Sequence, residues 1–148
     1  MHVAQLNIAR MLAPMESDVM KDFREGLEPI NALGEQSAGF VWRLKDEESG
    51  DATAIRIFDD EMIIVNLTLW ESVQSLFNFA YTSRHTEFLR RRTEWFEKSN
   101  VPMYVLWFVP EGHIPSTDEA KERLEHLQQH GETEYAFQFK YAKQLASA

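Results

Sequence analysis

The sequence predicts an α+β domain in which helices cover one face of an antiparallel sheet. Three observations lead to this fold class. Short runs of apolar residues recur along the chain, and several of them alternate with polar residues as strands do. Two long segments repeat their apolar residues at helical spacing. Strand runs that are interleaved with two long helices favour an antiparallel sheet with its helices on one side.

The N-terminal quarter is expected to form a strand and a helix. The strand covers His2–Ala9 and carries an unusual polar residue, Asn7, near its middle. Ser17–Asp18 can cap the helix, which should bend or restart at Pro29 because the proline ring does not fit a regular turn. A glycine, Gly34 or Gly39, ends the segment. The apolar stripe of this helix consists of Val19, Phe23, Leu27, Ile30 and Leu33.

Three strands are expected next, over Phe40–Leu44, Thr53–Phe58 and Met62–Trp70. The last of them has two unlike faces, because side chains alternate along a strand. One face is apolar and consists of Ile63, Val65, Leu67 and Leu69. The other face consists of Ile64, Asn66, Thr68 and Trp70. Since a buried asparagine or threonine needs hydrogen-bond partners or water, we expect a pocket on this second face.

A helix follows Ser72, and we expect it to break near Thr82–Ser83. Its apolar stripe continues through Tyr81, His85, Phe88, Leu89, Arg92 and Phe96, so His85 is predicted to face inward. Met103–Val109 reads as a strand buried on both faces. Ser116 and Glu119 form a capping box for a last helix. Alternating aromatic residues over Tyr135–Tyr141 then predict a C-terminal strand.

Composition limits the function classes. The 148 residues are the size of one domain, and we expect 1–148 to form a single one. The formal charge of −9 argues against nucleic acid as a partner, because phosphate binding needs a basic surface. The one basic run, Arg90–Arg92, is interpreted as a solvated helix face. The lack of cysteine fits a cytoplasmic location, and no apolar run is long enough to span a membrane.

The apolar face of Met62–Trp70 has no obvious cover in the predicted set of elements. A second copy of the chain would cover it, sheet against sheet, so the sequence predicts a homodimer.

Five segments carry a resemblance to a known family. They are AQLNIAR at 4–10, PINALGEQSAGFVWRL at 29–44, VNLTLWES at 65–72, FAYTSRHTEFLRRRTEWF at 79–96 and VLWFVPEGHIP at 105–115. The pattern resembles the dimeric α/β-barrel superfamily of ferredoxin-like domains, which includes antibiotic-biosynthesis monooxygenases. Within it, the chain most resembles an uncharacterised bacterial family of domains of unknown function. The resemblance implies a ferredoxin-like sheet to which the C-terminal helix and strand are added.

The resemblance also implies site residues. Cofactor-free monooxygenases of this type use an asparagine and a tryptophan near the pocket, to which Asn66 and Trp70 are similar. Haem-degrading relatives use an asparagine on the first strand, a tryptophan at a strand end and a histidine as iron ligand. Asn7, Trp70 and His85 resemble these three. The cofactor would thus be none or haem, and His85 would be a metal ligand only if haem is bound.

Other residues join this candidate site, each with a structural alternative. Arg43 could hold a carboxylate through its planar guanidinium, or it could pair with an acidic side chain. Tyr81 and Phe77 would line a flat aromatic cavity, or they could be ordinary core. His85, the two asparagines and Trp70 could likewise serve only packing and hydrogen bonding within the fold.

Two functions stay open. The first is a monooxygenase-like enzyme or haem-binding protein that acts on a flat apolar small molecule in a pocket between sheet and helices. The second is a non-catalytic module that binds a small molecule or assembles as a dimer. The sequence alone does not decide whether the protein is an enzyme.

Overall fold

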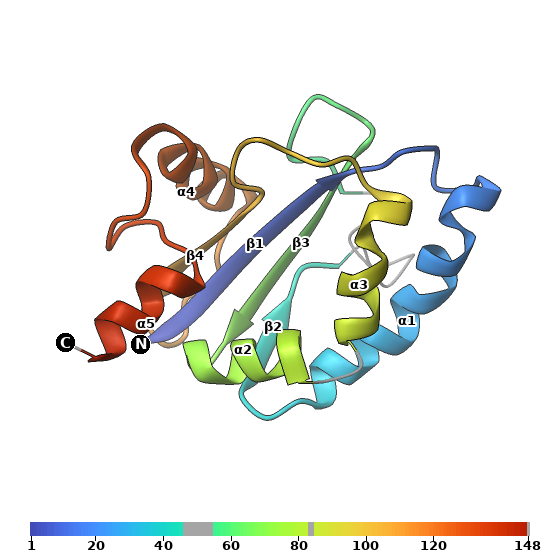
Figure 1. The fold of residues 1–148 in the computed structure, drawn as a ribbon. Helices are drawn as coiled ribbons and strands as arrows, with labels where there is room; N and C mark the ends of the chain where they lie inside the picture. Colours follow the sequence, from blue (N-terminus) through green and yellow to red (C-terminus); the bar gives the residue numbers. More distant parts are fainter. Residues whose placement is uncertain (46–54, 83–84, 148) are drawn as a thin grey trace.

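The computed structural model describes residues 1–45, 55–82 and 85–147, which fold around a four-stranded sheet (Figure 1). The elements in chain order are β1 (His2–Arg10), the 3₁₀ helix η1 (Asp18–Met20), α1 (Lys21–Gln36), β2 (Phe40–Arg43), β3 (Ile63–Trp70), α2 (Val73–Thr82), α3 (His85–Trp95), β4 (Tyr104–Val109), α4 (Thr117–His130) and α5 (Phe139–Ser147).

The order of strands in the sheet is β2-β3-β1-β4, and every neighbouring pair is antiparallel. This is the βαββαβ arrangement of ferredoxin-like folds, with α1 as the first crossover and α2 and α3 together as the second. The α+β, ferredoxin-like fold class is therefore confirmed. The two central strands, β1 and β3, are the longest, and they provide the floor on which a site can be built.

Helices cover both faces of the sheet. One face carries Val3, Trp70 and Leu106, which pack with α2 and α5, and it extends to Ile64, which packs with α1 and α3. In Figure 1, α2, α3 and α5 cross in front of the sheet, whereas α4 lies apart from them beside β4. The opposite face of the sheet packs against α4, which contributes Ala120, Leu124 and Leu127 to the contact.

The argument for a homodimer was therefore wrong in its premise. Val65, Leu67 and Leu69 are at most 5% exposed within a single chain, because α4 and neighbouring apolar side chains cover them. The helices of the ferredoxin-like unit share one face of the sheet, as predicted, and α4, part of the predicted C-terminal addition, covers the other. Whether the chain forms a homodimer through another surface stays a prediction.

Two predicted strands are not formed. Residues 55–58 of the predicted strand Thr53–Phe58 are not in the sheet, while 53 and 54 lie outside the described residues. Ile57 and Phe58 instead pack against the α4 side of the core. The predicted strand Tyr135–Tyr141 shrinks to one bridge, in which Phe137 and Leu106 exchange backbone hydrogen bonds of 2.7 and 2.9 Å. The chain then turns into α5 at Phe139.

The helix boundaries follow the expected signals more closely. α1 runs from Lys21 to Gln36 without restarting at Pro29. Gly39, with φ of 84°, turns the chain into β2, and a Cβ there would lie 2.3 Å from Ser75 Oγ of α2. Only glycine fits this close approach. The break expected near Thr82–Ser83 lies partly outside the described residues, in which α2 ends at Thr82 and α3 begins at His85. Ser116 caps α4 by accepting a 3.1 Å hydrogen bond from the Glu119 N–H.

No helix within the described ranges combines the length and the apolar character that a bilayer crossing requires.

Candidate functional site

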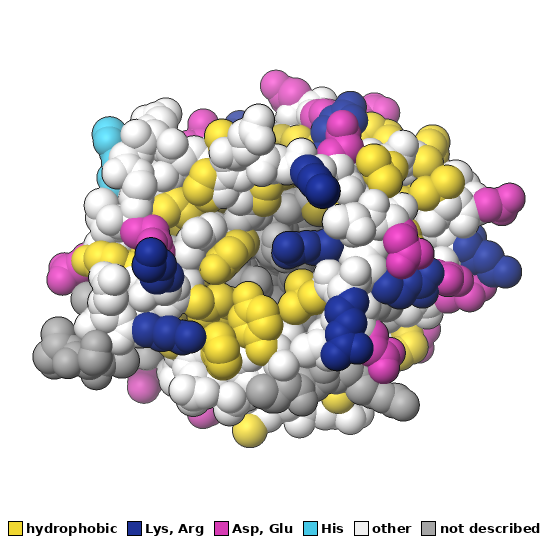
Figure 2. Space-filling model, viewed as in Figure 1, with side chains coloured by type: hydrophobic (Ala, Val, Ile, Leu, Met, Phe, Trp, Pro, Cys, Tyr) yellow, Lys and Arg dark blue, Asp and Glu magenta, His cyan; other side chains and the backbone are white. Residues whose placement is uncertain are grey.

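A cavity of about 650 Å³ lies between the sheet and the layer formed by α1, α2, α3 and α5. Its size is in the range of pockets that hold small organic molecules, roughly 300–1,000 Å³. Figure 2 shows the hollow near the middle of this face, with apolar side chains inside it and Lys or Arg side chains beside it. The cavity lies on the face of β3 that carries Asn66, where a pocket was predicted.

Polar side chains form the floor of the cavity. Asn7 of β1 is paired with Asn66 of β3 on one side and with Tyr104 of β4 on the other. In the next row of the sheet, Gln5 is paired with Thr68. Residues that oppose each other across a sheet project from the same face, so these side chains form one patch. Four of them line the cavity: Gln5, Asn7, Asn66 and Tyr104.

The amides of this floor differ in their bonding. Thr68 Oγ1 donates a 2.9 Å hydrogen bond to Gln5 Oε1, which satisfies the buried threonine and fixes the Gln5 amide. Within the described part of the chain, the side chains of Asn7 and Asn66 have no hydrogen-bond partner. Each amide offers an N–H donor and a carbonyl acceptor to whatever enters the cavity.

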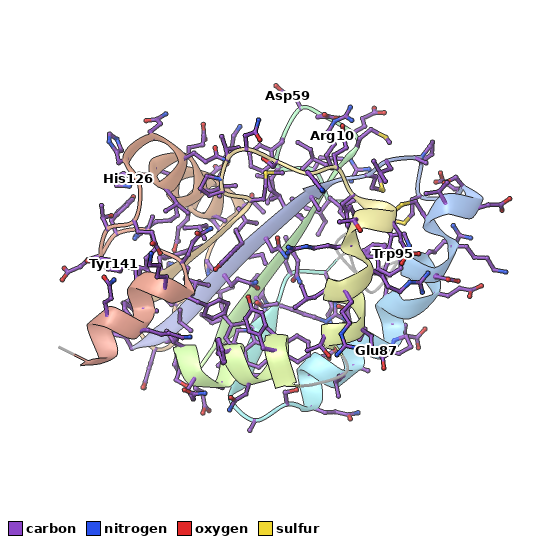
Figure 3. The ribbon with its side chains drawn as sticks, in the orientation of Figure 1. Arg10, Asp59, Glu87, Trp95, His126 and Tyr141 are labelled. Carbon is purple, nitrogen blue, oxygen red and sulfur yellow. The ribbon has the colours of Figure 1, made fainter. Side chains whose placement is uncertain are left out.

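The walls are mostly apolar and come from the helices. α1 contributes Phe23, Leu27 and Ile30, and α3 contributes Leu89 and Trp95. Trp95 lies between α3 and α1, with its ring centroid 5.4 Å from that of Phe23 (Figure 3). A cavity with apolar walls and a few polar groups on one side is the usual form of a small-molecule site.

An aromatic group closes the end of the cavity near α2 and α5. Phe139 has its ring centroid 5.6 Å from Tyr81 and 5.7 Å from Tyr104. Burial raises the pKa of the Tyr104 hydroxyl, and the nearby hydrogen bond from the Phe139 N–H only partly opposes this. Tyr104 therefore keeps its proton at neutral pH and can donate a hydrogen bond into the cavity.

Charged groups lie at the edges of the cavity. Arg43, whose side chain is 13% exposed, donates a 3.1 Å hydrogen bond from Nε to Glu35 of α1. The structural alternative for Arg43, pairing with an acidic residue, is thus present, although the side chain also lines the cavity. Glu97, the acidic residue of the lining, pairs with Arg10.

The structure brings four of the predicted site residues together: Asn7, Asn66, Arg43 and Tyr81 all line the cavity. Phe77 lies behind it, with its ring centroid 4.8 Å from that of Tyr81. His85 is the first residue of α3, but its side chain lies outside the described residues, so its predicted inward direction stays a prediction.

Trp70 is placed apart from these residues. It is 1% exposed and packs between Phe40 and Phe79, with ring centroids 5.4 and 5.2 Å away. It does not belong to the cavity lining. The strand pattern assigned Trp70 correctly to the helix-facing side of the sheet. The floor of the cavity, however, includes Asn66, earlier in β3, and does not extend to Trp70 at the end of the strand. The structure thus packs Trp70 as core.

Sequence reasoning missed several lining residues. Gln5 and Tyr104 become visible only through the strand register, which sets them beside Thr68 and Asn7. Arg92 was included in the inward stripe of its helix and also interpreted as part of a solvated basic run. It lines the cavity and is exposed, so both interpretations are partly true.

The donor set of the cavity bears on haem. Haem iron is usually held by the side chains of His, Cys, Met or Tyr. The described lining contains no imidazole or thiolate. It does contain Met103, Tyr81 and Tyr104, and burial raises the pKa of Tyr104, which opposes its ionisation to a tyrosinate ligand. Because methionine usually holds haem iron together with histidine, the described residues do not form the usual histidine- or thiolate-based ligand set for haem. No three acidic, His or Cys side chains of the described chain are placed to bind a metal ion.

Comparison with known proteins identifies the family. The chain belongs to the DUF3291 family, described as a domain of unknown function, whose pattern matches residues 2–148. This confirms the expected resemblance to an uncharacterised family of domains of unknown function. No curated protein sequence matches the chain.

Two solved structures are similar to this chain. The structure of Rv0793 from Mycobacterium tuberculosis is similar with a TM-score of 0.50 and 13% identity, over 76% of this chain and 100% of that one. A dabb family protein with a ferredoxin-like fold from Mesorhizobium loti MAFF303099 has a TM-score of 0.44 and 13% identity, over the same shares of the two chains. At this identity the likeness concerns the fold alone.

Proposed function

We propose that the domain binds a small, largely apolar organic molecule in the cavity between the sheet and the helices. The observation that carries the proposal is the pair Asn7 and Asn66, two adjacent amides without partners in the described chain, on the floor of an otherwise apolar cavity. Asn66 is exposed and Asn7 is half-buried, so neither amide needs a protein partner, and both are available to a molecule that enters the cavity.

The first experiment identifies the ligand. Native mass spectrometry of the purified protein is expected to show a bound small molecule that is released on unfolding. Ile30→Trp places an indole in the cavity from α1, so the bound mass should be lost while the far-ultraviolet circular dichroism is kept. Glu125→Trp adds the same side chain at an exposed position of α4, on the other face of the sheet, and should keep the ligand. Equal ligand content in both variants would contradict the proposal.

A second proposal is that dioxygen oxygenates the bound molecule without a cofactor, as in a monooxygenase-like enzyme. One oxygen atom replaces the two hydrogens of a CH₂ group, and the other leaves with these hydrogens as water, so the substrate itself supplies the electrons. Support comes from the same floor, because Asn7, Asn66 and the protonated Tyr104 can donate hydrogen bonds to a carbonyl oxygen that gains negative charge. Removing one such donor typically lowers kcat by about 10²–10³-fold.

This second proposal is tested by dioxygen uptake. Wild-type protein with its identified ligand should consume dioxygen, and Asn66→Leu should lower kcat by about 10²-fold if the amide stabilises the transition state. Binding of the ligand without dioxygen uptake would leave a non-catalytic binding module. Titration with haem, read at the Soret band in wild type and His85→Ala, tests the haem hypothesis. If wild type and His85→Ala give the same Soret band, His85 is not the ligand of the haem iron.

A further inference from the structure

The cavity is basic in a chain that is acidic. The whole sequence has 15 Lys and Arg against 24 Asp and Glu. The described lining of the cavity has three basic residues, Arg43, Arg92 and Lys98, against one acidic residue, Glu97. Glu97 is already paired with Arg10, so it does not offset the charge of the other lining residues. Figure 2 shows Lys or Arg side chains beside an apolar hollow on this face.

Two of the basic residues are not used by the fold. Arg10, Arg43 and Arg91 each form ion pairs with acidic side chains, and Arg91 does so with Asp22 of α1 and Glu94. Within the described chain, Arg92 and Lys98 form no ion pair, although acidic residues are in excess. Arg92 is in the last turn of α3, Lys98 is in the segment that follows, and both residues line the cavity.

We propose that the ligand is an amphipathic organic anion, with an apolar body and one carboxylate or chemically similar group that binds Arg92 and Lys98. This inference rests on the proposed small-molecule function and adds the class of ligand. The apolar body contacts Leu27, Ile30 and Trp95, and the amides of the floor bind its neutral polar groups. The guanidinium of Arg92 can hold a carboxylate with two parallel hydrogen bonds.

The competing explanation is structural. A cation near the C-terminus of a helix stabilises that helix through its dipole, and Arg92 has this position in α3. In that case, substitution of Arg92 would change the stability of the protein and not the discrimination between ligands. The experiment therefore measures discrimination.

The probes are pyrene-1-carboxylate and the neutral pyrene-1-methanol, which share one flat apolar body. Affinity is measured by fluorescence titration at 50 and 300 mM salt. The carboxylate should bind at least tenfold more tightly than the alcohol at low salt. The difference should shrink at high salt, because charges near solvent are screened. In Arg92→Gln/Lys98→Gln the two probes should bind equally.

Arg91→Gln is the control, since it removes the same charge from the same helix at a residue whose ion pairs are with Asp22 and Glu94. It should keep the preference for the carboxylate. Equal binding of both probes to wild type would overturn the inference and leave the proposed function standing. A preference that survives in the double variant would also overturn it. Failure of both probes to bind would overturn the proposed function itself.

Discussion

Two buried tryptophans differ in the hydrogen bonding of the indole N–H. Trp70 and Trp107 are both at most 1% exposed. Trp107 Nε1 donates a 2.8 Å hydrogen bond to Glu119, whereas Trp70 Nε1 has no acceptor among the described residues. Replacement by phenylalanine leaves a similar gap in both places, so the difference isolates the hydrogen bond. We expect Trp107→Phe to cost about 1–3 kcal/mol more unfolding free energy than Trp70→Phe, measured by urea titration. Equal costs would mean that the Glu119 contact adds nothing.

Glu119 predicts a pH dependence at the same scale. Burial acts to raise its pKa, but hydrogen bonds from His113 and Trp107 outweigh burial and lower it. A carboxyl whose pKa is lowered by folding stabilises the folded protein at pH values above the ordinary pKa of the group, near 4.5. This stabilisation is lost as the pH falls from that value through the lowered pKa of the folded state. The difference in unfolding free energy between wild type and Glu119→Gln should shrink as the pH falls below about 4.5. The exposed Glu125→Gln serves as control. A difference that grows toward low pH would contradict the assignment.

At the scale of elements, the start of α4 can be tested directly. Ser116 Oγ accepts the hydrogen bond from the Glu119 N–H, and loss of such a cap costs about 0.5–2 kcal/mol. Ser116→Ala should lower the unfolding free energy by about 1 kcal/mol with an unchanged fold, and Ser116→Thr should restore most of it. The measurement is chemical denaturation followed by circular dichroism. Ser116→Ala that is as stable as wild type would show that the cap is replaced by water.

The elements also show what the sequence could predict. Patterns that act locally, such as the alternation in β3 and the cap at Ser116, were sufficient for most helices and strands. The aromatic alternation over Tyr135–Tyr141 was not, because a strand needs a neighbour along its length. In the described chain, the C-terminal segment pairs with β4 only at Phe137, and it then folds over Tyr104. The pocket face followed from one strand, but Gln5 and Tyr104 entered the site through a register that no local pattern contains.

For the whole molecule, the main difference from the expectation is the position of α4. Its sequence shows only a thin apolar stripe, which gave no sign of which surface it would cover. In the structure that stripe covers the face carrying Leu6, Leu67 and Trp107, so one chain completes both of its layers. The cavity and α4 thus lie on opposite faces of β1 and β3. A substitution that changes the packing of α4 can therefore be made without changing the lining of the cavity.

That separation leads to a last prediction. Leu124 of α4 is fully buried in the core against the sheet, so Leu124→Ala should cost about 2–5 kcal/mol of unfolding free energy, while substitution of its exposed neighbour, Glu125→Ala, should cost little. Loosening α4 uncovers an apolar sheet face, so Leu124→Ala should also bind more of an apolar dye and associate as its concentration rises, in light scattering. Ligand content should stay as in wild type, because the cavity is on the other face. A cost below about 1 kcal/mol for Leu124→Ala would mean that α4 does not bury this face of the sheet. A partner chain would then be needed to cover the face.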